Sequence, residues 1–160
     1  MRSRIITILF CTASILALWA VASYEPVSLY TIDTPYEYPV VPGTPEWLSY
    51  ATVIGRRKAC QVPDEILEHM TTDALLLTAL DYPFMSDIYA FNTMQMGYEA
   101  VKKHCNSLRE FERRSDCLEA LSRYCQSISS LDEEEKTLEN YMAEHLYRII
   151  ADIKSAPQSA

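Results

Sequence analysis

The stretch from Cys60 to Val101 constrains the fold most, because it holds the densest run of apolar side chains outside the N-terminal leader. Helix start and stop signals interrupt it repeatedly. Pro63 suits the first turn of one helix, and the Thr71-Thr72-Asp73 run is an N-cap signal for the next. That second helix must end before Pro83, because the residue before a proline is disfavoured in the α region. Its leucines cover nearly the whole circumference, so we expect burial on most sides.

Helix signals on both sides of this stretch complete an all-α prediction of about six helices in a compact bundle or irregular stack. Thr44 is a candidate N-cap for a helix that runs to about Cys60. Capping-box patterns mark three later helix starts, at 92–95, 107–110 and 130–133. Residues 107–128 form either two helices or one kinked helix, and both alternatives stay open. The last helix is expected to run from the third box to about Ile153, with one apolar stripe.

Gly97 lies inside the helix expected after residue 92. A glycine in a helix interior costs roughly 1 kcal/mol relative to alanine. Either another backbone packs closely against Gly97, or the glycine only weakens the helix. The sequence gives these two alternatives equal weight.

A string of short motifs between about residues 40 and 115 resembles an uncharacterised family of exported bacterial helical proteins. The motifs are Pro-Gly-Thr-Pro-Glu-Trp at 42–47, Ala-Cys-Gln-Val-Pro at 59–63, Met-Thr-Thr-Asp at 70–73, Leu-Asp-Tyr-Pro at 80–83, Asp-Ile-Tyr-Ala-Phe at 87–91 and Gly-Tyr-Glu-Ala-Val at 97–101. The resemblance implies export and a helical fold. It carries over no residue roles. The chain departs from the family in its additional cysteines, Cys105, Cys117 and Cys125.

The N-terminus predicts export. Arg2 and Arg4 precede an apolar run from Ile5 to Ala22, which ends in an Ala-Val-Ala cleavage site. We expect cleavage after Ala22 and a secreted or extracytoplasmic protein. The alternative is an uncleaved membrane anchor at residues 5–22, because a run of this length nearly spans a bilayer. The chain then divides into a signal peptide (1–22), an extended Pro- and Tyr-rich tether (23–43), a helical domain (44–154) and a disordered tail (155–160).

The predicted tether holds the residues that we expect to contact a partner. Its prolines prevent a helix and favour extended backbone. Its tyrosines are required by no helical pattern, which makes them candidates for recognition: Tyr24, Tyr30, Tyr36 and Tyr38. They lie either along the helical body or in a segment that a partner binds. We expect an extended tether whose last part, from Val40, packs on the helices.

The chain is acidic, with a formal net charge of −8. Removal of the leader with Arg2 and Arg4 lowers this charge by two, to −10. A protein of this charge repels nucleic acids and anionic membranes, and it suits a basic partner. Of the two interpretations, an acidic surface that is merely solvated is the favoured one.

The cysteines outside the leader predict disulfides, because an even number in an exported protein is typical of them. They are Cys60, Cys105, Cys117 and Cys125. Cys117 and Cys125 are eight helical residues, or about 12 Å, apart, whereas bonded cysteines have Cα atoms within about 7 Å. Cys105 is therefore expected to pair with Cys117 or Cys125. Cys60 takes the remaining partner or stays buried and reduced.

No pattern in the sequence predicts catalysis, a metal or a cofactor. His69, His104 and His145 lack the spacing of zinc ligands, and the adjacent His104 and Cys105 point away from each other on a helix. The chain has no G-x-S-x-G, P-loop or dinucleotide motif, and it has only three glycines. The aromatic side chains between 82 and 98 have helical spacing, which favours core packing over a binding surface.

These observations predict an exported, non-enzymatic helical module that binds another protein or has a structural role. Two alternatives remain. The first is a hydrolase of envelope polymers whose site is assembled from distant residues. The second is an inhibitor or immunity-like protein for a basic toxin.

Overall fold

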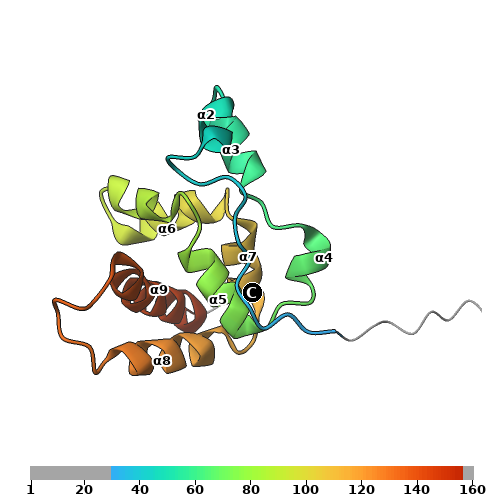
Figure 1. The fold of residues 1–160 in the computed structure, drawn as a ribbon. Helices are drawn as coiled ribbons and strands as arrows, with labels where there is room; N and C mark the ends of the chain where they lie inside the picture. Colours follow the sequence, from blue (N-terminus) through green and yellow to red (C-terminus); the bar gives the residue numbers. More distant parts are fainter. Residues whose placement is uncertain (1–29, 157–160) are drawn as a thin grey trace, which may run out of the picture. The chain divides into compact units, whose positions relative to one another are not determined.

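The computed structural model describes residues 30–156, and the chain is all-α within them, as predicted (Figure 1). The helices are α2 (Pro45–Ser49), α3 (Val53–Ala59), α4 (Asp64–Leu67), α5 (Thr72–Leu80), the 3₁₀ helix η1 (Met85–Ala90), α6 (Met94–Lys102), α7 (Asn106–Arg113), α8 (Cys117–Ile128) and α9 (Leu138–Ser155). They are more numerous than the expected six. None of the helices described is both long enough and apolar enough to cross a bilayer. The predicted signal peptide at 1–22 lies outside the described residues.

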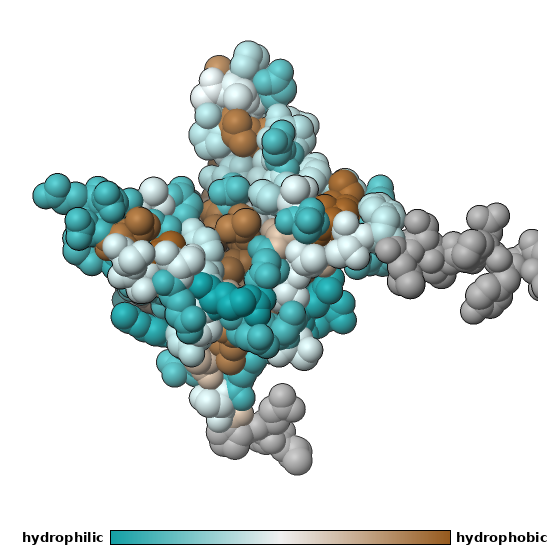
Figure 2. Space-filling model, turned by 60° about the horizontal axis from the view of Figure 1, so that its bottom comes forward, coloured by the Kyte–Doolittle hydropathy of each residue, from teal (hydrophilic) through white to brown (hydrophobic). Residues whose placement is uncertain are grey.

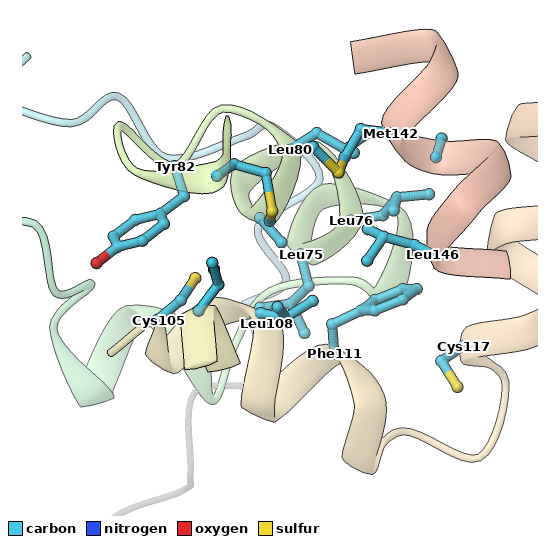
Figure 3. Packing of buried hydrophobic residues seen from close by; sticks show 14 of the residues in the cluster. Leu75, Leu76, Leu80, Tyr82, Cys105, Leu108, Phe111, Cys117, Met142 and Leu146 are labelled. Carbon is cyan, nitrogen blue, oxygen red and sulfur yellow. The ribbon is translucent and has the colours of Figure 1, made fainter. Parts of the chain in front are cut away.

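Helix α5 is the centre of the helical domain. It packs against α7, α8 and α9, which surround it in Figure 1. Most of its residues are buried, as its leucine-rich sequence predicts. Figure 3 shows Leu75, Leu76 and Leu80 of α5 among Leu108 and Phe111 of α7 and Met142 and Leu146 of α9. This single core fixes the positions of the surface elements described below.

The helix boundaries differ most from the prediction at two places. Residues 44–60 form two helices rather than one, because Tyr50 is extended and Thr52 caps a new helix by accepting a hydrogen bond from the backbone of Gly55. The last helix begins at Leu138 rather than near Ser130. There Thr137 and Asn140 form a reciprocal capping box, in which each side chain bonds the backbone of the other. Several residues can act as the N-cap of a helix, and contacts with the other helices determine which of them does so.

Residues 107–128 form two helices, so the single kinked helix is wrong. Arg114 is in the extended region and ends α7 before α8 begins at Cys117. Ser107 does not act as the expected N-cap. It lies inside α7, fully buried, and its hydroxyl contacts Tyr38 and Cys105.

The segment before α2 packs on the helices earlier than expected. Packing begins at Ile32 rather than Val40, because Ile32 forms an isolated parallel bridge to Met70 with backbone hydrogen bonds of 2.8 Å on each side. Tyr38 is then buried against α5 and α7. Its hydroxyl donates to the carbonyl oxygen of Thr78 at 3.1 Å and lies 3.1 Å from the hydroxyl of Ser107. From Ile32 onward, the predicted tether is thus a component of the domain.

Gly97 is a site of close backbone approach, which confirms one of the two alternatives. A Cβ atom at this position would lie 2.0 Å from the carbonyl oxygen of Ile88. The absent side chain therefore allows α6 to lie directly on η1.

The predicted disulfides are not formed, since within residues 30–156 all four cysteines are free thiols. Cys105 precedes α7 and Cys117 follows it, with the side chains of Leu108 and Phe111 between them (Figure 3). Eight helical residues separate such positions by about 12 Å, well beyond disulfide range. Helix α7 therefore lies between the two thiols and holds them apart.

Candidate functional site

The two helices that precede residue 60 form an exposed arm, which we call the α2–α3 arm (Pro45–Ala59). No residue of either described helix is buried. The side chains of Leu48 and Ile54 are 72% and 69% exposed, and Val53 is 48% exposed. Figure 2 shows separate hydrophobic areas, in brown, among hydrophilic atoms on the arm at the top of the view. These three exposed apolar side chains lie outside the core, and they are the candidates for contact with a partner.

Trp47 attaches the α2–α3 arm to the rest of the domain. Its ring packs on Phe84, with centroids 4.9 Å apart. The guanidinium of Arg56 lies over the same ring and donates through Nε to the carbonyl oxygen of Trp47 at 3.1 Å. The arm therefore has a defined position at its base, although its outer face is open to solvent.

A groove lies beside the arm, where α3 approaches the end of α6. It consists of two adjoining hollows of about 290 and 330 Å³. The two hollows share three wall residues, all basic: Arg57, Lys103 and His104. The first hollow continues to Tyr82, Phe84, Asp87, Phe91, Ala100 and Val101, and the second to Ile54, Lys58 and Gln61. We call this feature the basic groove.

Arg57 is the most firmly held cation of the basic groove. Its Nη2 donates to a carboxylate oxygen of Asp87 at 3.0 Å, and its guanidinium lies 5.3 Å from the centroid of Phe84. Its buried Nε has no hydrogen-bond acceptor among residues 30–156. A buried donor without an acceptor costs roughly 1–3 kcal/mol. The guanidinium is thus fixed in place with unused donor capacity.

The end of α6 presents Lys103 and His104 to the basic groove. The carbonyl oxygen of His104 accepts hydrogen bonds from Gln61 at 2.7 Å and from the hydroxyl of Tyr82 at 2.9 Å. Arg109 donates to the carbonyl oxygens of residues 102 and 103, both at 3.0 Å. Carbonyl oxygens at a helix end carry partial negative charge and repel anions. Here other donors satisfy them, so the basic side chains determine the local charge.

The helix dipole explains each basic cluster separately but does not explain their meeting. Arg56, Arg57 and Lys58 occupy the last turn of α3, where cations are favourable, and Lys103 follows α6 in the same way. The fold brings the two helix ends to one groove on a chain whose net charge is −8. In the sequence, the position of Lys102-Lys103-His104 at the end of a helix is sufficient to explain the run. Two basic runs in an acidic chain were the signal that could have pointed to the groove.

The tyrosines predicted to contact a partner have different environments. Tyr24 lies outside the described residues. Tyr30 is 52% exposed, Tyr36 is half-buried and Tyr38 is buried. Burial raises the pKa of Tyr38, so its hydroxyl stays protonated as a donor in the core. Tyr38 is therefore a packing residue, and the three of these four tyrosines within residues 30–156 do not form one exposed surface.

The aromatic side chains between 82 and 98 are only partly in the core. Tyr82, Phe84 and Tyr98 are buried, as expected. Tyr89 and Phe91 are instead 41% and 43% exposed, and Phe91 lines the basic groove. The helical spacing predicted core positions for them, but η1 is a 3₁₀ helix that ends before Phe91 and turns it outward.

Cys60, Cys105 and Cys117 have the character of core residues rather than nucleophiles, whereas Cys125 is half-buried. Cys60 and Cys105 are fully buried, and burial raises the pKa of the Cys105 thiol to about 11. The thiolate is the reactive form of cysteine, and it is scarce at neutral pH when the pKa is this high. In the part of the chain that the structure describes, no three His, Cys, Asp or Glu side chains are grouped as metal ligands would be.

Comparison with protein families, curated proteins and solved structures gave no match. The α2–α3 arm and the basic groove therefore have to be interpreted from their own chemistry.

Proposed function

We propose that this protein is an exported, non-enzymatic module that binds another protein through the α2–α3 arm and the basic groove. The apolar face of the arm carries the proposal. Burial of one leucine or isoleucine side chain contributes roughly 1.5–3 kcal/mol, so Leu48 and Ile54 are the strongest candidates for binding energy. Apolar anchors beside a polar, charged margin are the usual composition of a protein interface.

The charge of this surface refines the partner predicted from composition. The net charge of −8 suggested a basic partner. The surface that exposes the apolar anchors is instead lined by Arg57, Lys58 and Lys103. Complementary charge gives specificity to an interface, so an acidic partner suits this surface better. Export is part of the proposal and rests on the N-terminal leader pattern.

Site-specific photo-crosslinking in the native host tests the proposal. A benzophenone amino acid is placed at Ile54 on the arm and, as a control, at Gln126, which is exposed on α8. We expect a discrete protein adduct from position 54 and none from position 126. The second-site substitution Leu48→Glu should abolish the adduct by placing a charge on the apolar face. Absence of an adduct at position 54, or the same adducts from both positions, would show that the arm is not a docking surface.

A further inference from the structure

We propose that the basic groove binds an acidic peptide segment in which one carboxylate is flanked on both sides by apolar side chains. This inference rests on the proposed function, because it names the chemistry of the partner at the same surface. The arrangement of the groove supports this inference, because basic residues lie where its two hollows meet. Arg57 and Lys103 line both hollows, together with His104, so these two cations stand at their shared boundary. The apolar walls lie on either side of that boundary.

The shared boundary is suited to a carboxylate. Asp87 is the one acidic residue among those described that line the two hollows, and Arg57 already pairs with it. Lys58 and Lys103 are exposed cations on the same walls. Because Asp87 already pairs with Arg57 and the Nε of Arg57 is buried, Lys58 and Lys103 supply the charge that attracts an incoming carboxylate. The excess of positive charge at this boundary thus favours binding of one carboxylate group of a ligand.

The two hollows are suited to apolar side chains. Phe84, Phe91 and Val101 form the apolar wall of the first hollow, and Ile54 forms that of the second. Each hollow, at about 300 Å³, is at the lower end of the range of ligand pockets. Such a volume accepts one or two side chains of a bound segment. Ile54 also belongs to the exposed face of the α2–α3 arm, so a peptide in the groove continues onto the arm.

The same features disfavour nucleic acids and anionic membranes as occupants. A chain of net charge −8 repels extended polyanions at long range, whereas a single carboxylate is attracted by the groove at short range. The cations line recessed hollows rather than a convex surface, which suits a peptide better than a plane of headgroups.

This inference can be tested by measuring peptide binding to the protein purified from its native host. The probe is a display library of 12-residue peptides whose central residue is Glu, Gln or Lys between randomised neighbours. We expect enrichment of Glu-centred peptides with apolar residues on both sides. Replacement of the central Glu by Gln should weaken binding at least about tenfold, and higher salt should weaken it further. Equal binding of Glu- and Gln-centred peptides would overturn the inference.

Charge reversals provide the matched comparison on the protein. Lys58→Glu and Lys103→Glu should each weaken the selected peptides about tenfold, because both side chains are exposed and line the groove. Lys154→Glu makes the same charge change at an exposed position that lines neither hollow, and it should change binding less than about twofold. If all three substitutions weaken peptide binding equally, then the peptides respond only to the net charge of the protein. That result would contradict the groove as the binding site.

The outcomes separate this inference from the proposed function. If the Ile54 crosslink persists in Lys103→Glu and no acidic peptide is selected, the arm binds a partner but the ligand class is wrong. If the crosslink itself is absent, the proposed function fails first. Binding to phosphatidylglycerol vesicles without peptide binding would assign the groove to lipid headgroups. Concentration-dependent dimers that Lys103→Glu dissociates would assign it to a second copy of this chain.

Discussion

Replacement of Gly97 by alanine tests how α6 packs on η1. In an unconstrained helix this change stabilises by roughly 1 kcal/mol, because glycine has the greater backbone freedom to lose. Here the new Cβ would lie 2.0 Å from the carbonyl oxygen of Ile88 and 2.7 Å from its carbonyl carbon. Ordinary contact at a Cβ begins near 3.4 Å, so the oxygen has to move by 1.4 Å, the difference between 3.4 and 2.0 Å.

That movement cannot be local, because the obstructing atoms are backbone and Ile88 is fully buried. Overpacking of a core costs roughly 1–3 kcal/mol, and displacement of backbone belongs at the upper end of that range. After the helix-propensity gain is subtracted, we expect Gly97→Ala to destabilise the protein by about 2 kcal/mol. For a domain of this size that lowers the melting temperature by roughly 5–10 °C.

Gly55→Ala is the matched control, because Gly55 is also inside a helix. Its Cβ would meet only side-chain atoms, those of Thr52 and Tyr50 at 3.3 Å, which can adjust. We expect this variant to stay within about 1 kcal/mol of the wild type. Urea denaturation followed by circular dichroism compares the two variants. If Gly97→Ala is as stable as Gly55→Ala, the close approach of α6 to Ile88 is wrong.

Three further predictions concern stability, pH and thiol reactivity. Tyr38→Phe removes a buried hydroxyl that donates to a carbonyl oxygen of α5, so urea denaturation should show a free energy of unfolding lower by about 1–2 kcal/mol. An unchanged denaturation midpoint would mean that the segment around Tyr38 does not pack on the helices. Burial raises the pKa of Glu110, but hydrogen bonds from Arg113 and Arg114 outweigh the effect of burial and leave the pKa below its usual range. The ionised carboxylate therefore stabilises the fold above its unfolded pKa, and this stabilisation is lost as the pH falls through the folded pKa. We expect Glu110→Gln to lower the free energy of unfolding by about 1 kcal/mol at pH 7 and by progressively less below about pH 4. A difference between variant and wild type that stays constant across pH would contradict the assignment. Iodoacetamide at pH 8 should modify half-exposed Cys125 before fully buried Cys105, as read by peptide mass spectrometry, and equal rates in the native protein would refute the burial of Cys105.

The helical character of the chain follows from local signals. Pro63, the threonine caps and the leucines of α5 act through steric exclusion, backbone hydrogen bonds and helical periodicity, all within a few residues. The burial of α5 on most sides was predictable for the same reason, because an apolar surface around a whole helix has to be covered by other elements.

Choices between nearby signals could not be made locally. Ser107 and Ser130 begin two of the predicted capping patterns, but neither is the N-cap of α7 or α9. Thr137 is used because Asn140 completes its box and also bonds Tyr124 on α8. Ser107 is not used because α7 begins one residue earlier and buries its hydroxyl. The deciding partners are distant in sequence, so only packing could select among them.

The sequence by itself determined an acidic, helical chain with short elements and a leader pattern, since composition and periodicity are properties of neighbouring residues. The tertiary structure decided that Tyr38 belongs to the core, that the thiols are apart and that α6 touches the backbone of η1 at Gly97. It also decided that Arg57 and Lys103 share one groove. These facts depend on contacts between segments far apart in the chain, which the packing of helices around α5 creates.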